Sequence, residues 1–362
     1  MLTSLKLLLL AILTPVLVVS APAAKTLTFY TIDVEGGKSV LVVSPSGESM
    51  LFDAGWPSAG NREASTGRIV TALKGAGLKQ LDYLVISHFD VDHLGDVPAL
   101  ADRFPIRHIM DHGQIQFPPA AKSGNLSGLA RFNTYAELRQ KIGYTVLKPG
   151  DKIPLKGVDI EVVASAGRLL HKPLKGAGAS NTLCATNPQP ASIERDVEDD
   201  QSIGLLFTFG KFRMLDLADL EAHLSHELVC PANLIGTVDV YHVNVHGQFK
   251  GIAAELTGAV RPTVAIMGNG ARKGGDPATW PILRATAGLE DIWQVHYSAA
   301  GAKDTNPPPD FIANLEQAAD EFAMIKLVVQ SNGTYAVTNT RNGFTKTYKV
   351  GMAEGMKKPE LP

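Results

Sequence analysis

Cysteine is scarce in this sequence, with only Cys184 and Cys230 among 362 residues. The two are isolated from each other and lack the close spacing of a cysteine-ligated metal cluster, so that kind of site is excluded. In an oxidising compartment the two can pair in a disulfide, and two isolated free cysteines are the alternative. The sequence alone leaves these alternatives open.

Net charge is also small. The chain has 34 basic and 36 acidic side chains, which gives a formal charge of −2. A mildly acidic protein has no general electrostatic field that attracts polyanions. The balance therefore argues against extended binding of nucleic acid, although a local basic loop can still hold one phosphate.

Long hydrophobic runs are missing beyond the N-terminus. Residues 1–23 combine Lys6, an apolar run over residues 7–19 and the small residues Ala21-Pro22-Ala23, which is typical of a secretory signal peptide. The run is short for a spanning helix, and no later segment reaches ~18 consecutive apolar residues. We expect an exported protein, periplasmic or secreted, with no transmembrane segment in its mature chain. An uncleaved anchor is the alternative.

The sequence lacks a Gly-x-Ser-x-Gly element, and neither cysteine lies in a recognisable catalytic context, so no covalent nucleophile is predicted. What it has is a cluster of possible metal ligands after an apolar run at residues 81–86 that is typical of a buried strand. The ligands are His88, Asp90, Asp92 and His93. Imidazole and carboxylate are groups that zinc accepts. The alternative is a polar turn in which Asp92 or Asp96 caps the next helix, which explains one carboxylate and neither histidine.

This stretch resembles the His-x-His-x-Asp-His hallmark of the metallo-β-lactamase superfamily, with Asp90 in the place of the second histidine. The resulting His-x-Asp-x-Asp-His form looks like the variant in the hydrolase domain of the ComEC competence proteins. Residues 31–39 resemble the opening strand and turn of the superfamily, and residues 50–55 resemble its second-strand element. The resemblance extends over residues 26–300. It implies an α/β fold, a four-layer αββα sandwich with the metal site at one edge between the two sheets.

The hydrophobic pattern predicts two halves, each of which begins with strands and ends in helix–strand units. Strands are expected at residues 26–33, 38–45, 48–53, 82–87, 106–111, 202–209, 211–217, 238–245, 262–267 and 291–297, and helices at 66–76, 128–142, 220–229, 251–258 and 278–286. Residues 166–200 lack periodicity and predict a long surface loop of the kind that is often functional. We expect a metallo-β-lactamase-like hydrolase domain over residues 24–300. A breaker loop and a small C-terminal β appendage, packed on the same domain, would occupy residues 301–362.

Two further ligand candidates follow predicted strands. His112 resembles the third-motif histidine of the superfamily, and Asp111 beside it could orient its ring; a turn histidine is the alternative. Asp219 resembles the aspartate that bridges both metal ions in the family. Asp216 is its competitor, but it lies within the predicted strand.

His246 is the last candidate and ends the predicted strand at residues 238–245. Alternation places His242 on the same strand face. Gly247 resembles the family's turn glycine, but Val245 stands where the family has another histidine. Either His246 is the ligand and nothing is lost, or the second metal ion is bound weakly.

The resemblance implies two divalent metal ions. One would take His88, Asp90, His112 and Asp219, and the other Asp92, His93, His246 and the same Asp219. Zinc is the first choice, and Asp90 hardens the first site enough to admit manganese or iron. Two such cations lower the pKa of a shared water towards ~7, which gives a hydroxide that attacks a carbonyl or phosphoryl centre. Asp92 and Asp219 are the predicted catalytic residues, and Asp92 could also transfer a proton.

A glycine-rich loop at residues 268–275 is the candidate for binding a small-molecule substrate. Arg272 and Lys273 offer positive charge to a phosphate or carboxylate, although a solvated turn is the alternative. His296, at the end of the next strand, is a further candidate. Three functions remain open: a hydrolase of phosphodiesters or related small anionic esters, a lactone or β-lactam hydrolase, and a non-catalytic metal-binding relative.

Overall fold

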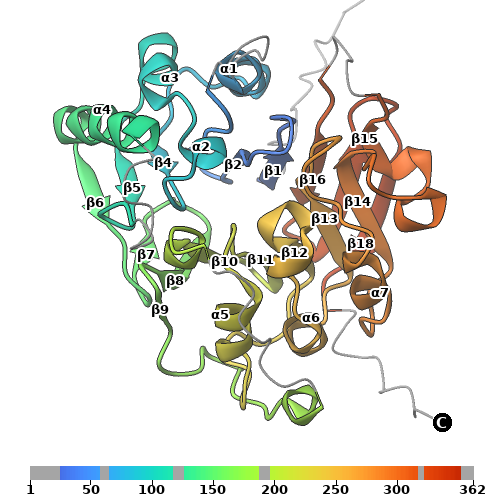
Figure 1. The fold of residues 1–362 in the computed structure, drawn as a ribbon. Helices are drawn as coiled ribbons and strands as arrows, with labels where there is room; N and C mark the ends of the chain where they lie inside the picture. The colour runs from blue at the N-terminus through green and yellow to red at the C-terminus, as the bar shows by residue number, and fades with distance from the viewer. Residues whose placement is uncertain (1–24, 58–64, 117–125, 187–195, 317–321, 352–362) are drawn as a thin grey trace, which may run out of the picture.

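The computed structural model describes residues 25–57, 65–116, 126–186, 196–316 and 322–351, and the expected signal peptide lies outside them. Two nine-stranded sheets form the centre of the fold (Figure 1). Side chains from both sheets form one shared core, which includes Phe29, Phe207 and Trp293. The sheets therefore pack face to face.

The first sheet has the order β18-β17-β16-β1-β2-β3-β4-β5-β6. Strands β3 to β6 run parallel to one another, and the remaining neighbours are antiparallel. The bounds are β1 Leu27–Thr31, β2 Val40–Val43, β3 Ser49–Phe52, β4 Tyr83–Val85, β5 Ile109–Asp111, β6 Tyr144–Val146, β16 Ile325–Val329, β17 Thr334–Asn339 and β18 Thr345–Lys349.

The second sheet has the order β15-β14-β13-β12-β11-β10-β8-β7, with β9 paired to β8. Strands β11 to β15 are parallel, and the others are antiparallel. The bounds are β7 Lys152–Ile153, β8 Asp159–Ser165, β9 Arg168–Leu169, β10 Gly204–Phe209, β11 Phe212–Asp216, β12 Val240–His242, β13 Val264–Met267, β14 Asp291–His296 and β15 Ile312–Asn314.

Helices cover the outer face of each sheet, because each has one apolar side that must be buried. Ile69 of α1, Leu100 of α3 and Phe132 of α4 pack in the core beside the first sheet. Leu256 of α6 and Leu283 of α7 pack beside the second. The bounds are α1 Ser65–Gly75, α2 Val91–Leu94, α3 Val97–Arg103, α4 Leu126–Ile142, α5 Ala222–Glu227, α6 Ala254–Val260 and α7 Thr279–Arg284. Helix, sheet, sheet and helix make four layers, which confirms the predicted α/β sandwich.

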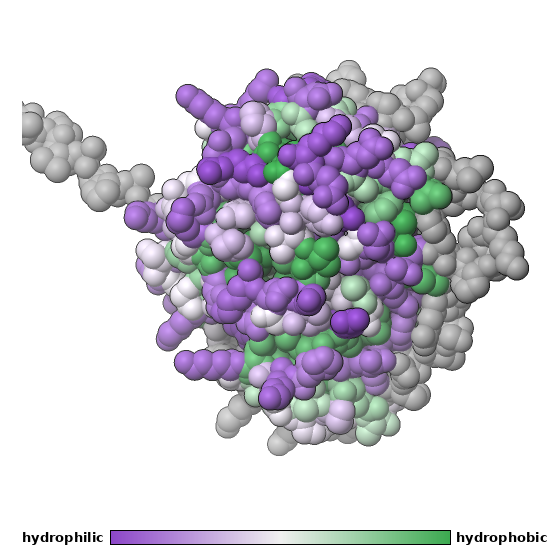
Figure 2. Space-filling model, turned by 90° about the vertical axis from the view of Figure 1, so that its left-hand side faces the viewer, coloured by the Kyte–Doolittle hydropathy of each residue, from purple (hydrophilic) through white to green (hydrophobic). Residues whose placement is uncertain are grey.

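None of the helices in the described ranges is both long and apolar enough to cross a bilayer. On the side of α4 and β6, hydrophilic side chains cover most of the surface, and the apolar areas between them are small (Figure 2).

The three C-terminal strands extend the first sheet. Strand β16 pairs antiparallel with β1, opposite Leu27 to Thr31, and β17 and β18 follow it. The sequence pattern predicted these strands as an appendage. Their place in the sheet follows from a pairing between residues about 300 positions apart, which no local pattern reveals.

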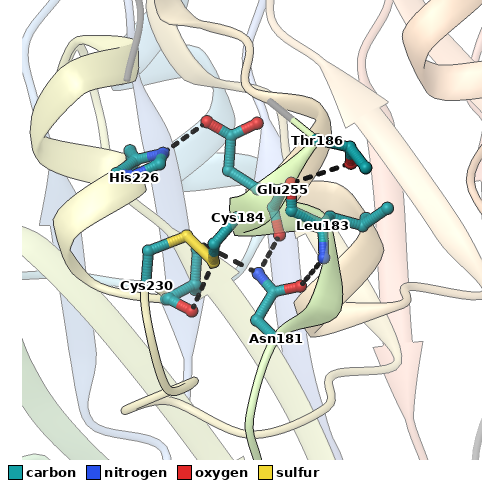
Figure 3. The surroundings of a disulfide bond; sticks show 8 residues. Asn181, Leu183, Cys184, Thr186, His226, Cys230 and Glu255 are labelled. Carbon is teal, nitrogen blue, oxygen red and sulfur yellow. Dashed lines mark hydrogen bonds and ion pairs between the residues drawn. A yellow bond between two sulfur atoms is a disulfide. The ribbon is translucent and has the colours of Figure 1, made fainter. Parts of the chain in front are cut away.

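The two cysteines form a disulfide, the first of the two alternatives that the sequence left open. Cys184 lies in the short 3-10 helix η1 (Thr182–Ala185), and Cys230 follows α5. Figure 3 shows hydrogen bonds around this link: Asn181 donates to the carbonyl of Glu255 at 3.0 Å, and the Glu255 carboxylate pairs with His226 at 2.6 Å. The bond ties the segment before residue 187 to the helix that follows Asp219.

Candidate metal centre

The site lies where the carboxyl ends of parallel strands from the two sheets meet. Strand β4 leads through residues 86–90 into α2, which carries Asp92 and His93. Strand β11 leads to Asp219, and β12 leads to His246 in the short helix η3 (Asn244–Gly247). Chain segments that leave neighbouring parallel strands converge at such an edge, so residues distant in sequence come together there.

Four buried side chains form the centre of the site. The Nε2 atom of His93 lies 3.3 Å from Asp92 Oδ2 and 3.3 Å from Asp219 Oδ2. The Nε2 atom of His246 lies 3.2 Å from Asp92 Oδ2 and 3.1 Å from Asp219 Oδ2. The two Nε2 atoms are 3.2 Å apart.

These separations match a tetrahedral zinc site. Zinc bonds to imidazole nitrogen and carboxylate oxygen are ~2.0–2.2 Å long, so neighbouring donors in a tetrahedron lie roughly 3.3–3.6 Å apart. The five separations here are 3.1–3.3 Å, at or slightly below the lower end of that range. The donor set and its spacing therefore fit one divalent cation among these four residues.

The tautomers of both histidines also fit a cation. The Nδ1 atom of His93 pairs with Asp53 Oδ2 at 2.9 Å, and that of His246 lies 3.2 Å from the carbonyl oxygen of Gly268. A carbonyl oxygen only accepts, so Nδ1 of His246 carries the hydrogen, and the carboxylate favours the same tautomer for His93. Both Nε2 lone pairs then point into the group, as metal ligation requires.

The electrostatics of the group favour added positive charge. Burial alone would raise the pKa of Asp92, but Lys273 and His93 outweigh it and hold this pKa well below its usual value. Burial would also raise the pKa of Asp219, but the nearby His246 and His93 outweigh it and hold this pKa well below its usual range. The pKa of His93 is raised well above normal despite burial, because Asp219, Asp92 and Asp53 surround it. The two carboxylates are therefore ionised and attract cations.

A second group of possible ligands adjoins the first, and the imidazole rings of His88 and His93 are 4.1 Å apart. Nε2 of His88 lies 3.3 Å from Asp199 Oδ1 and 4.0 Å from Asp90 Oδ2. Asp199 begins the 3-10 helix η2 (Asp199–Gln201), just before β10. The site thus has room for ligands of two neighbouring ions.

Comparison with known proteins agrees with this geometry. Residues 32–171 match the family model described as the metallo-beta-lactamase superfamily. The match includes the stretch from His88 to His93 and extends over less than half of the 362 residues. No curated protein matches the chain.

Several solved structures resemble the chain at low identity. YhfI from Bacillus subtilis, a metallo-beta-lactamase fold protein, is 11% identical, with 74% of this chain and 95% of that chain covered and a TM-score of 0.44. Igni18, a metallo hydrolase from Ignicoccus hospitalis, is 16% identical, with 74% and 94% covered and a TM-score of 0.41. CmlA, a diiron beta-hydroxylase from Streptomyces venezuelae, is 13% identical, with 75% and 48% covered and a TM-score of 0.39. Likenesses at this level say nothing about activity.

His112, the candidate for the family's third-motif histidine, lies apart from both groups. Its Nε2 atom is 2.8 Å from Glu198 Oε1, and its ring stacks on Phe89 with centroids 4.3 Å apart. Asp111 does not orient the imidazole, because its oxygens bind Arg139 at 2.5 Å and Tyr135 at 2.7 Å. The structure thus differs here from the ligand set that the resemblance implies.

The structure shows how Val245 is accommodated at the position where the family has another histidine. Strand β12 ends at His242, short of the predicted residue 245, because Val245 and His246 both have left-handed backbones with φ of 49° and 54°. The side chain of Val245 is buried against Gly251, where an added Cβ would lie 2.2 Å from a Val245 methyl. Four donors still meet in the group that contains His246, so a histidine at position 245 is not needed to complete that group.

Asp216 and His242, the alternatives to Asp219 and His246 as ligands, both contact the buried side chain of Lys38. Lys38 Nζ donates to both oxygens of Asp216, at 2.6 and 2.8 Å, and lies 3.4 Å from Nδ1 of His242. Burial and the nearby Lys38 charge lower the pKa of His242 to about 3 despite Asp216, so this ring is neutral. These residues lie beneath the site and are not among its grouped donors.

The predicted substrate residues have three different environments. Arg272 is exposed. Lys273 is 30% exposed, and its ammonium group contacts Asp92 Oδ2 and lies 5.0 Å from the centre of the Trp56 ring. His296 is buried, and its Nε2 donates to Asp33 Oδ1 at 2.6 Å, so the prediction that it orients substrate does not agree with the structure.

Sequence reasoning missed Asp53 and Asp199. Asp53 lies within the 50–55 element, and its position directly after the buried strand β3 is the signal that could have identified it. Asp199 lies in the aperiodic segment at residues 166–200, which was identified as a functional loop without a ligand being assigned. The capping alternative applies to Asp96 alone, whose side chain accepts from the N–H of Ala99 at 3.1 Å and begins α3.

Proposed function

We propose that the protein is a hydrolase whose active centre holds two divalent metal ions, with zinc the first choice and manganese or iron as alternatives. The observation that carries the proposal is the group Asp92, His93, Asp219 and His246, with donor separations of 3.1–3.3 Å. The adjoining group of His88, Asp90 and Asp199 supports a second ion.

Metal ions of this kind, when bound, supply Lewis acidity that lowers the pKa of a water towards ~7 and polarises an ester. The protein contributes the arrangement around them. Asp53 holds His93 in the ligating tautomer, and its link to Ser87 extends this support towards His88. Asp92 Oδ2 faces the centre of the group and would be its ligand atom, so a transferred proton would be held by the other carboxylate oxygen of Asp92. Asp219, whose pKa is held well below its usual range, stays ionised and would be the ligand shared by both ions.

The substrate that fits best is a phosphodiester or a related small anionic ester. Two ammonium groups stand at the site, Lys273 beside Asp92 and Lys250 beside Asp199, and each is about a third exposed or less. Lys273 contacts Asp92, and in a metal-loaded site its ammonium group would be available to an anionic group of the substrate. The ComEC-like His-x-Asp-x-Asp-His motif supports the same class. We propose a small substrate because the mildly acidic chain has no general electrostatic field that would attract a long polyanion.

We further propose that the protein is exported to the periplasm or secreted. The N-terminal pattern at residues 1–23 is that of a signal peptide. The Cys184–Cys230 disulfide is consistent with an oxidising compartment, where such bonds persist.

Hydrolysis assays and metal analysis test the proposal together. Purified protein is loaded with zinc or manganese and assayed on a phosphodiester, a lactone and a cephalosporin. We expect about two ions per chain and turnover of the phosphodiester. His93→Ala and Asp219→Ala should each remove bound metal and activity while the circular dichroism spectrum stays unchanged. Full turnover by either variant, or fewer than two ions per parent chain, would refute the proposal.

Lysine substitution tests the anionic substrate. Lys273→Ala should raise KM for the phosphodiester by about tenfold, the loss of roughly one charge-assisted contact. The KM for a neutral lactone should be unaffected. Arg272→Ala, an exposed neighbour in the same loop, is the control. Equal effects of Lys273→Ala on both substrates would move the assignment to the lactone class.

A further inference from the structure

We propose that Asp199, and not His112, completes the first metal site together with His88 and Asp90. This inference rests on the binuclear centre proposed above and names a ligand that the family resemblance does not supply. It is carried by the environments of three side chains: His88, Asp199 and His112.

His88 has a buried ring nitrogen with no hydrogen bond. The side chain is fully buried, and Nε2 has no hydrogen-bond partner of acceptable geometry among the described residues. On the opposite side of the ring, Nδ1 lies 3.0 Å from Ser87 Oγ and 3.4 Å from Ser202 Oγ. Ser87 Oγ already donates to Asp53, so it accepts from Nδ1, and in the neutral ring that metal binding requires the lone pair is on Nε2. A bound cation would give this buried nitrogen the partner that it lacks.

Asp199 supplies an oxygen at the right place. Its carboxylate is almost fully buried, and Oδ1 lies 3.3 Å from Nε2 of His88, within the donor spacing found at the other site. The other oxygen, Oδ2, contacts Lys250 Nζ. One oxygen is therefore neutralised by the lysine, while the other faces the imidazole lone pair.

The backbone fixes this arrangement. The N–H of Ile203 donates to the carbonyl of Ser87 at 3.0 Å, and the N–H of Ser202 donates to the carbonyl of Asp199 at 3.0 Å. These bonds hold the residues just before β10 against Ser87, which follows β4. Asp199 thus reaches His88 from a segment over 100 residues away in the chain.

Glu198, the residue before Asp199, keeps His112 out of the site. Its Oε1 binds Nε2 of His112 at 2.8 Å and the N–H of Phe89 at 2.8 Å, and its Oε2 accepts from the N–H of Gln116 at 2.6 Å. The nitrogen that a metal ion would need is therefore occupied. The two consecutive acidic residues therefore have different roles: Glu198 binds His112, and Asp199 provides a ligand.

A carboxylate from Asp199 in place of the imidazole of His112 changes which cation the first site prefers. Besides the shared Asp219, the first site offers one imidazole and two carboxylates, whereas the second site offers two imidazoles and one carboxylate. Oxygen-rich sites favour harder ions, and manganese is the first candidate among the metals already considered. We expect the two sites to differ in metal preference.

Metal titration distinguishes the two ligand sets. Apo-protein is titrated with Mn²⁺ and the free ion is followed by electron paramagnetic resonance, with bound metals counted by mass spectrometry. Asp199→Asn should lose one of two bound ions, or bind it at least about tenfold more weakly. His112→Ala should keep both ions. Lys250→Met removes the same ion pair from Asp199 but leaves Oδ1, and it should also keep both.

The outcomes separate this inference from the proposed function. Parent protein with two ions, and an Asp199→Asn variant that binds both with parent affinity, overturns the inference alone. So does loss of one ion in His112→Ala with an unchanged circular dichroism spectrum. A parent that binds fewer than two ions overturns both proposals. If Asp199→Asn fails to fold, Asp199→Ala with the same titration decides the question.

Discussion

Asp53 gives the sharpest test of how the site is built, because one carboxylate serves both groups. Its Oδ1 accepts from the N–H of Ser87 at 2.6 Å, and its Oδ2 accepts from the Ser87 hydroxyl at 2.7 Å and pairs with Nδ1 of His93 at 2.9 Å. In Asp53→Asn the amide oxygen must stay on the backbone N–H, so the NH₂ group faces His93. An NH₂ group donates, and Nδ1 must then accept. The hydrogen of His93 moves to Nε2, the atom that points at the metal site.

The expected loss is in metal affinity and not in folding. Substitutions of groups that orient metal-bound histidines cost about 10–100-fold in affinity. That range equals about 1.4–2.7 kcal/mol of binding free energy. The metal-dependent gain in unfolding free energy, measured at a fixed excess of zinc, should fall by a similar amount. Competition with a chromophoric chelator measures the affinity, and urea unfolding with and without zinc measures the stability.

Asp111→Asn is the matched control. Asp111 is also fully buried at the end of a parallel strand, but its carboxylate binds Arg139 and Tyr135. Its substitution should lower the unfolding free energy of the metal-free protein and leave zinc affinity within threefold of the parent. If Asp53→Asn also binds zinc within threefold of the parent, the argument from the tautomer of His93 is wrong.

Three further predictions follow from the contacts described. His246→Ala should weaken zinc binding far more than His242→Ala, which removes a neutral ring; chelator competition decides, and an equal loss would move the ligand role to His242. Replacing Cys184 and Cys230 by alanine should lower the unfolding free energy by up to about 4 kcal/mol, the chain-entropy value for a loop of this length; a loss below about 1 kcal/mol in urea unfolding would contradict it. Chelation of metal from the parent should lower its melting temperature, while His93→Ala should melt at the same temperature with and without chelator.

Much of the site could be predicted from the sequence because its signals are local. His88, Asp90, Asp92 and His93 stand within six residues after one strand, and Asp219 and His246 follow other strands. The structure gathers four of these six in one group and the remaining two beside it. Strand ends meet at one edge in any parallel α/β arrangement, so polar residues at such ends point to a shared site.

What the sequence could not predict depends on tertiary contacts. Glu198 pairs with His112 across 86 positions, and only folding reveals that this histidine has another partner. The predicted strand at 238–245 stops early because Val245 takes a left-handed backbone, which is rare for a β-branched residue and has no pattern in the sequence. Lys273 likewise reaches Asp92 from a loop whose shape depends on its glycines.

The place of β16 beside β1 has a consequence for how the chain matures. Without β16 the first strand would present an unpaired edge, and its neighbours in the shared core, among them Leu327 and Tyr335, would be missing. An open apolar edge of this kind invites association with other chains. Leu27–Thr31 is made early in synthesis, but the chain must reach Val329 before that strand gains its second partner. A polypeptide stopped near residue 300 would therefore hold every proposed ligand and still be prone to aggregate.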